Sequence, residues 1–334
     1  MKRYLLAIVA MVLAVNVAAQ DEIRIGIIGL DTSHSTAFTK LINSGDEEWA
    51  EGYRVVAAYP YGSQVIKSAY ERIPEYTEKV KEYGVEIVGS IDELLGKVDC
   101  VLLETNDGNL HLEQAVAVFK AGKPCFIDKP LAATLPQAMA ICELAERYNA
   151  KFFTSSTLRY TPRNQELRAE AEGKIKGADC FSPHTQEPTH PEYGFYGIHG
   201  IETLYTVMGG KGCVAVSRMA THKDHVVVGE WEDGRIGTFR AFLDGTQLYG
   251  GTVYTDRNKA LAAGGYIGYK DLLKEILRFF STGVEPISRE ESLEIFAFMR
   301  AANLSGERGG ARVTIEEAFR SAEKEAKKLL KQYK

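Results

Sequence analysis

The stretch Ile23-Arg-Ile-Gly-Ile-Ile-Gly-Leu-Asp-Thr-Ser-His34 joins an apolar, isoleucine-rich run to a turn of small and polar residues. A helical pattern begins at 37–43, after Ser and Thr residues that can cap a helix. Further apolar runs suited to strands follow at 54–59, 85–88, 100–104, 125–127 and 151–154, with helical patterns at 91–95, 110–121 and 135–148 between them. This alternation of strand and helix predicts an α/β fold with a parallel sheet covered on both faces.

The pattern changes near residue 156. Alternating stretches at 214–219, 226–231 and 236–243 are typical of antiparallel strands with one solvated face. Helical patterns return at 201–207, 272–280, 290–303 and 315–332. We therefore expect a doubly wound Rossmann domain over 20–155, and an α+β domain with an open mixed or antiparallel sheet over 156–334.

The composition of the 334 residues is that of a globular protein, with 45% hydrophobic and 25% charged residues. Forty basic and forty-five acidic residues give a formal net charge of −5, and no basic run stands out. A face that neutralises phosphates would need such a run, so the sequence disfavours nucleic-acid binding. The five scattered cysteines include no Cys-x-x-Cys pair, which indicates buried thiols rather than a disulfide scaffold or a zinc site.

Residues 1–19 resemble a cleavable signal peptide. Lys2 and Arg3 precede a short apolar run, and small residues at 17–19 stand where a signal peptidase cuts. The run is too short for a membrane-spanning helix, which needs about 20 residues. We expect a secreted or periplasmic protein that begins near Gln20 and has no stable membrane anchor.

The turn after the first strand contains half of a dinucleotide-binding fingerprint. Gly26 and Gly29 stand before a helix, where glycine lets the backbone approach a pyrophosphate. Asp31 stands where the second glycine of the pattern would fall. A negative charge there is unfavourable beside a pyrophosphate unless a cation intervenes. The fingerprint alone is therefore weak evidence for a nucleotide site.

Two further segments carry more information. Residues 105–111 (TNDGNLH) follow an apolar strand and open a helix, and residues 121–131 (AGKPCFIDKPL) run through a strand to a Lys-Pro step. Together with 156–162 and 197–201, these motifs resemble the Gfo/Idh/MocA family of NAD(P)-dependent oxidoreductases. The resemblance covers essentially the whole chain after the predicted signal peptide.

The resemblance implies an enzyme that oxidises a hydroxyl of a sugar, polyol or glycoside and passes hydride to NAD or NADP. It assigns Lys129 to contact both cofactor and substrate, with His199 as the neighbouring acid or base. Both side chains can titrate near neutrality in a suitable environment. The residues expected along the cofactor are Gly29, Asp31, Thr32, Ser33, Thr105, Asn106, His111 and Lys129.

The second half of the chain supplies the residues expected to bind substrate. They are Arg159, Tyr160, His184 and Tyr196. Aromatic and hydroxyl-bearing side chains suit stacking on a sugar ring. An alternative is a metal site, because three histidines and the carboxylates of Glu187 and Glu202 fall within residues 184–202. Two prolines in this stretch prevent helical spacing of such ligands, which favours a substrate-binding loop without a metal.

Three positions depart from the family's pattern. Phe195 stands where the family has an aspartate before the histidine, the run 59–62 has no acid to bind a ribose, and Asp31 replaces a glycine. These departures keep a second hypothesis open, namely a carbohydrate-binding or sensing protein without a cofactor. Within the enzyme hypothesis, tightly bound NAD used transiently for glycoside cleavage would suit an exported protein. Relatives with an exposed sheet also suggest a homo-oligomer formed through the C-terminal sheet.

Overall fold

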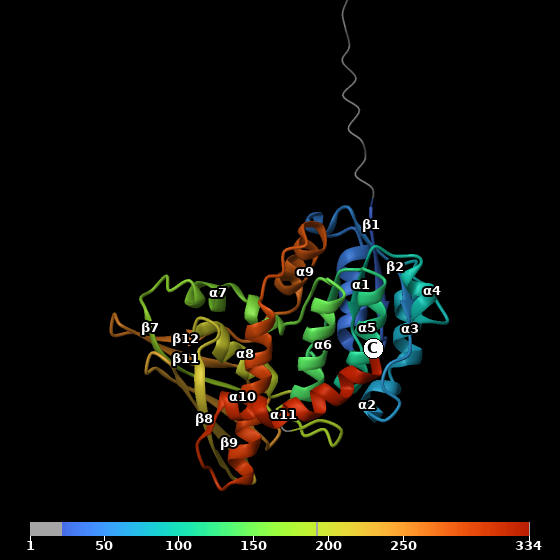
Figure 1. Ribbon diagram of the computed structural model, residues 1–334. Helices are drawn as coiled ribbons and strands as arrows, with labels where there is room; N and C mark the ends of the chain where they lie inside the picture. The colour runs from blue at the N-terminus through green and yellow to red at the C-terminus, as the bar shows by residue number, and fades with distance from the viewer. Residues whose placement is uncertain (1–21, 192, 334) are drawn as a thin grey trace, which may run out of the picture.

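The computed structural model describes residues 22–191 and 193–333, so the predicted signal peptide lies outside the described residues. A six-stranded sheet and a seven-stranded sheet form the two halves of the molecule (Figure 1). In the described residues, no helix combines the length and apolar character needed to cross a membrane. All five cysteines are buried and free, as the sequence indicates.

The first sheet is parallel throughout, in the order β3-β2-β1-β4-β5-β6. Its strands are β1 (Ile23–Ile28), β2 (Tyr53–Tyr59), β3 (Glu86–Ile87), β4 (Cys100–Leu103), β5 (Cys125–Ile127) and β6 (Phe152–Phe153). This is the strand order of a doubly wound Rossmann sheet, in which ligands bind at the carboxyl ends of the strands. The predicted parallel α/β fold is confirmed.

Helices cover both faces of this sheet because its strands are apolar on both sides. The helices are α1 (Ser33–Asn43), α2 (Lys67–Tyr70), α3 (Ile73–Lys81), α4 (Ile91–Leu95), α5 (Gly108–Lys120) and α6 (Leu135–Arg147). In β1, Ile25 and Ile27 pack into one apolar cluster with α1 and α3, whereas Ile28 packs into the other with α4, α5 and α6. The two short helices α2 and α3 between β2 and β3 are absent from the sequence prediction.

The second sheet is mixed, in the order β12-β11-β7-β10-β9-β8-β13. Its strands are β7 (Ile175–Pro183), β8 (Cys213–Ala220), β9 (Asp224–Trp231), β10 (Ile236–Phe242), β11 (Gly250–Thr255), β12 (Ala260–Ala263) and β13 (Val313–Thr314). Only β7 and β10 pair in parallel. Burial alternates along β9, so one face is covered and the other faces solvent, as predicted.

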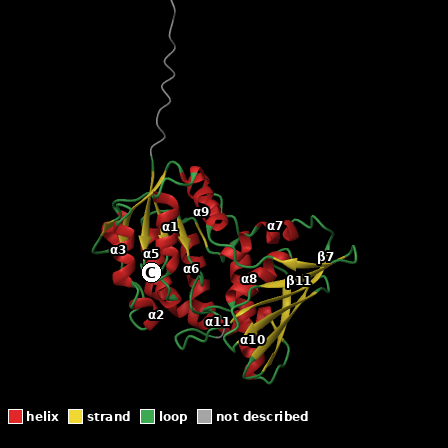
Figure 2. Ribbon diagram, turned by 180° about the vertical axis from the view of Figure 1, so that it is seen from behind, coloured by secondary structure: helices red, strands yellow, loops and turns green. Residues whose placement is uncertain are grey.

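The remaining α-helices follow residue 156 in the sequence. They are α7 (Pro162–Arg168), α8 (Ile198–Val207), α9 (Lys270–Thr282), α10 (Arg289–Glu307) and α11 (Ile315–Leu330). Figure 2 shows α8 and α10 on the inner side of the second sheet, towards the first. Helix α9 returns to the first half, where Phe279 packs edge-on against Phe153 of β6. Helix α9 comes from the second half of the chain but completes the core of the first sheet. The domain boundary expected at 155/156 therefore stays a prediction.

Candidate functional site

A cleft of about 310 Å³ lies where the loops after β1 and β5 meet the second half of the chain. Its walls are formed by Ser33, His34, Lys129, Thr157, Leu158, Tyr196, His199, Gln247, Tyr249, Tyr266 and Tyr269. Because β1 and β5 are parallel, both loops leave the carboxyl edge of the sheet, which is the ligand-binding edge of this architecture. The cleft brings together four residues singled out from the sequence: Ser33, Lys129, Tyr196 and His199.

Lys129 is held at the end of β5 by carbonyl and aromatic groups. Its side chain is largely buried, and Nζ donates a long hydrogen bond of 3.5 Å to the carbonyl of Phe195. The same nitrogen lies 5.0 Å from the centre of the Tyr196 ring, a cation–π distance. The amine is thus fixed beside a ring that also faces the cleft.

His199 lies in the first turn of α8 and is oriented by a serine. Its Nδ1 is 2.8 Å from Oγ of Ser156, whose backbone N–H donates to Glu202 at 2.8 Å. Burial, and next the charge of Lys129, hold the pKa of His199 well below its usual value, so the ring is neutral at pH 7. Ser156 thus pairs with one ring nitrogen of His199 in a site where Phe195 supplies no carboxylate.

The other three residues predicted to bind substrate do not line this cleft. Arg159 is buried and donates to Glu202 at 2.8 Å and to Glu291 at 2.7 Å, so its charge is neutralised inside the protein. Tyr160 packs in the apolar core of the first sheet. His184 lies at the end of β7 and borders two other cavities.

The alternative metal site between His184 and Glu202 is not assembled. His190 Nε2 accepts a hydrogen bond from the backbone N–H of Gly108 at 3.2 Å, and Glu202 is bound by Arg159. These side chains point to different partners. Among the residues that the structure describes, the group of three metal-ligating side chains that does converge lies elsewhere.

The turn after β1 is tight, and only glycine fits at its first position. Gly29 has φ of 92°, and a Cβ there would lie 2.6 Å from the backbone nitrogen of Thr105. Thr32 caps α1 by accepting from the N–H of His34 at 3.2 Å. The turn is therefore a tight connection from strand to helix that requires glycine at position 29.

Asp31 ties this turn to two neighbouring loops. Its carboxylate accepts from the backbone N–H groups of Ser63 and Asn106, each at 2.9 Å. Gly62 approaches so closely that a Cβ there would lie 2.0 Å from an Asp31 oxygen. Burial raises the pKa of Asp31 to about 6. In the fingerprint, the second glycine would leave space here for a pyrophosphate. In this structure the carboxylate of Asp31 and the loop after β2 fill that space.

Thr105 and His111 fix the loop after β4 rather than facing the cleft. Both are buried, and His111 Nε2 lies 2.6 Å from the carbonyl of Thr105, while its Nδ1 lies 3.2 Å from the carbonyl of Leu131. Burial lowers the pKa of His111, and the neutral ring can donate its single N–H to only one of these two carbonyls while it packs between the loops after β4 and β5. Its role in this structure is to position those two loops.

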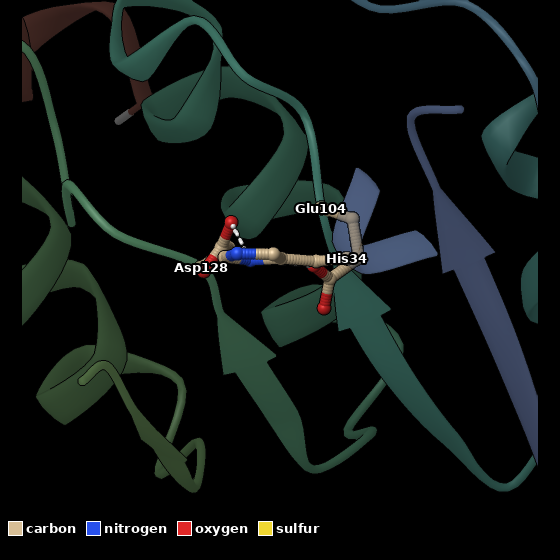
Figure 3. A group of neighbouring side chains, drawn as sticks. All are labelled: His34, Glu104 and Asp128. Carbon is tan, nitrogen blue, oxygen red and sulfur yellow. Dashed lines mark hydrogen bonds and ion pairs between the residues drawn. The ribbon is translucent and has the colours of Figure 1, made fainter. Parts of the chain in front are cut away.

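The sequence prediction did not include His34 as a site residue. His34 lines the cleft, and its Nδ1 is 2.8 Å from Oδ2 of Asp128 (Figure 3). It stands where the third glycine of the fingerprint spacing would fall, five residues after Gly29. A histidine in place of this glycine is the sequence feature that could have indicated a site residue. The tyrosines at 249, 266 and 269 gave no such signal, because they reach the cleft from loops of the second half.

Comparison with known families identifies the first domain. The family model described as "Oxidoreductase family, NAD-binding Rossmann fold" matches residues 23–156. This region belongs to the Gfo/Idh/MocA oxidoreductase family. The resemblance drawn from the motifs is confirmed for these residues, and the family is described as one of NAD-binding Rossmann domains.

Relatives of the Gfo/Idh/MocA domain include sugar and polyol enzymes. A 1,5-anhydro-D-fructose reductase of Ensifer adhaerens is 32% identical over 132 residues, 38% of each chain. An inositol 2-dehydrogenase of Cereibacter sphaeroides is 29% identical over 127 residues, 37% of this chain and 33% of that protein. The match thus spans 38% and 33% of the length of these two curated relatives.

A solved structure extends the likeness to both halves of the molecule. The scyllo-inositol dehydrogenase of Lactobacillus casei, with bound NAD(H) and scyllo-inositol, superposes with a TM-score of 0.69. The match covers 89% of this chain and 100% of that chain at 15% identity. At this identity the likeness establishes the fold, including the mixed sheet of the second half.

Proposed function

We propose that the protein is an NAD(P)-dependent oxidoreductase that oxidises a hydroxyl group of a sugar, polyol or glycoside. The observation that carries this proposal is the cleft, where Lys129 and His199 line one cavity although they come from different halves of the chain. Their position beyond the carboxyl ends of the Rossmann strands supports catalysis beside a nucleotide. The names of the relatives support a cyclic polyol or sugar as substrate.

Each side chain of the cleft has a task in such a reaction. The bound cofactor supplies the acceptor for the hydride that leaves the carbon bearing the hydroxyl. His199 takes the hydroxyl proton at Nε2, because Nδ1 is paired with Ser156 and the ring is neutral at pH 7. The Lys129 amine donates a hydrogen bond to the same oxygen and stabilises its developing negative charge. Tyr196, Tyr249 and Tyr266 provide faces for the substrate ring.

The test of this function uses a panel of inositols, free sugars and glycosides with NAD or NADP. Absorbance at 340 nm reports reduced cofactor, and Lys129→Met removes the amine while it keeps much of the apolar stem. We expect reduction with at least one compound and its loss in the variant. Full activity in both Lys129→Met and His199→Ala on that compound would overturn the assignment of these residues.

The cofactor fits the residues at the nicotinamide end of the cleft better than those at the turn after β1. Ser33 and Lys129 line the cleft, whereas the buried carboxylate of Asp31 fills the turn. We propose that NAD or NADP binds when Asp31 is neutral, because the repulsion between carboxylate and pyrophosphate then disappears. The raised pKa of Asp31, about 6, makes that form accessible at mildly acidic pH.

Asp31 also favours a second function, a carbohydrate-binding or sensing protein that has no cofactor. In that case the carboxylate would serve only to join the loops after β1, β2 and β4. Calorimetry with NAD and NADP on folded protein separates the two functions. Absence of binding of either nucleotide at millimolar concentration and pH 5.5 would favour the second.

We also propose that the protein is exported and that it uses its cofactor transiently. A signal peptide over residues 1–19 would deliver the protein to the periplasm or medium, where no soluble nicotinamide pool is expected. A retained cofactor that is reduced and reoxidised during glycoside cleavage would meet that condition. N-terminal sequencing from the native host should begin near Gln20, and an intact Met1 in a cytoplasmic fraction would refute export.

The solvent face of the second sheet supports the proposed homo-oligomer. Met219 of β8, Ile236 of β10 and Tyr254 of β11 are 76%, 54% and 43% exposed, which is unusual for large apolar side chains. Burial of this face against a second copy would remove them from water. Light scattering should show a dimer or larger assembly that Met219→Glu weakens, and a monomer at high concentration would refute the proposal.

A further inference from the structure

Three side chains converge beneath the cleft, just beyond the ends of adjacent strands (Figure 3). His34 comes from the first turn of α1, Glu104 directly follows β4, and Asp128 directly follows β5. Nδ1 of His34 is 2.8 Å from Oδ2 of Asp128 and 3.9 Å from Oε2 of Glu104. One donor atom from each residue lies within 4.8 Å of the other two.

The two carboxylates of this cluster are buried and poorly satisfied. Glu104 is 0% and Asp128 1% exposed. Within the described part of the chain, neither oxygen of Glu104 has a hydrogen-bond partner, and Oδ1 of Asp128 has none either. A buried carboxylate without such partners is strongly unfavourable unless a positive charge or a proton compensates it. The cluster therefore requires a compensating group.

We propose that His34, Glu104 and Asp128 bind a divalent transition-metal cation, of which Zn²⁺ and Mn²⁺ are representatives. One imidazole nitrogen with two carboxylates is a donor set that such ions accept. The ion would neutralise both carboxylates and give the unpartnered oxygens of Glu104 a ligand. Figure 3 shows the three side chains directed toward one another, as such a site requires.

The position of this site gives the ion access to the chemistry of the cleft. His34 lines the cleft wall, and Asp128 precedes Lys129 in the chain. Three protein ligands leave at least one coordination position for a water or a substrate oxygen. An ion here would act as a Lewis acid on an oxygen bound in the cleft. This inference goes beyond the proposed dehydrogenation and stands independently of cofactor binding.

The competing occupant of the cluster is a proton. Burial, with a smaller contribution from the charge of Asp128, raises the pKa of Glu104 well above its usual value. A neutral Glu104 beside the hydrogen-bonded pair of His34 and Asp128 would then satisfy the cluster without a metal. If a proton compensates the carboxylates, the chain should bind no stoichiometric metal, whereas the metal site predicts one ion per chain. A titration with metal therefore distinguishes the two.

The experiment uses the full chain, stripped with a chelator and then titrated with Zn²⁺ or Mn²⁺ in the absence of nucleotide and sugar. We expect one ion per chain by calorimetry and by elemental analysis after gel filtration. Glu104→Gln should weaken binding by more than the roughly 10–100-fold that loss of an outer-sphere partner costs. Glu294→Gln is the control, because Glu294 accepts backbone N–H groups of Gly212 and Cys213 far from the cluster and should leave affinity unchanged.

A second readout guards against a misfolded variant. Co²⁺ bound at the cluster should give visible absorption bands that His34→Asn shifts or abolishes, while circular dichroism checks the fold. Absence of stoichiometric binding of either ion to the wild-type chain, or equal affinity in wild type and folded Glu104→Gln, would overturn the metal site and assign the cluster to a proton. Because nucleotide and sugar are omitted, failure of the proposed dehydrogenase function would leave this result unaffected.

Discussion

Replacing Asp31 with asparagine is expected to abolish a pH dependence of NAD binding. Burial raises the pKa of Asp31 to about 6, so the carboxyl group is neutral below that pH and charged above it. If only the neutral form admits the pyrophosphate, the apparent Kd varies inversely with the neutral fraction. That fraction falls about tenfold for each pH unit above 6, so binding at pH 8 should be about 100-fold weaker than at pH 5.

Calorimetric titration with NAD at pH 5, 6, 7 and 8 measures this dependence directly. Asp31→Asn should bind with nearly the same Kd across the range, because its amide does not titrate. Asp99→Asn is a matched control, since Asp99 pairs with Arg24 at the start of β4, away from the carboxyl ends of the strands, and the control should keep the wild-type slope. Equal wild-type Kd values at pH 5 and pH 8, or a slope that survives in Asp31→Asn, would show that the charge of Asp31 does not control NAD binding.

Three further predictions test the cleft and its supports. Lys129→Met should lower turnover by about 10²–10⁴-fold without unfolding the chain, whereas Lys123→Met, before β5, should leave turnover unchanged in the same 340 nm assay. Arg159→Leu should cost about 3–5 kcal/mol in urea unfolding, because it leaves the buried carboxylate of Glu202 without a cation and removes one of the two arginines that pair with Glu291, and a loss below 1 kcal/mol would contradict this. Gly29→Ala should lower the thermal midpoint more than Gly45→Ala, since both have positive φ but only Gly29 is crowded. Equal shifts would argue against the crowding.

The fold was readable from the sequence because the strands of a parallel sheet are buried on both faces. The segments 25–28 and 100–103 are free of polar side chains, and both lie at the centre of the sheet. Helix α9 was recognised as a helix but not as part of the first core. Its apolar stripe indicates that it packs, but the stripe does not specify against which sheet.

The candidate site was readable only in part, because sequence motifs mark the loops that carry a site and not the direction of each side chain. Lys129 and His199 were found from such motifs and line the same cleft. Arg159 belongs to a similar motif, yet its guanidinium points inward to two carboxylates. Local sequence could not foresee these partners, because Glu202 and Glu291 lie 43 and 132 residues away.

For His34, the sequence shows an unusual residue but not the contact that gives it a role. Its place in the fingerprint spacing is visible in the sequence, but its contact with Asp128 depends on the pairing of β1, β4 and β5. Residues 94 positions apart become neighbours only when those strands adopt their order in the sheet. The sequence therefore reveals the substitution of a glycine, and the structure reveals its consequence.

A single-turnover reaction measures hydride transfer to the bound cofactor directly. NAD-loaded protein in excess is mixed at pH 5.5 with a panel of inositols, sugars and glycosides, and absorbance is followed at 340 nm. Excess protein makes reduced cofactor visible even where the hydride later returns to the product. We expect a rise at 340 nm with at least one compound, and Lys129→Met should suppress it. No rise with any compound, although bound NAD is demonstrated by mass spectrometry, would contradict this expectation.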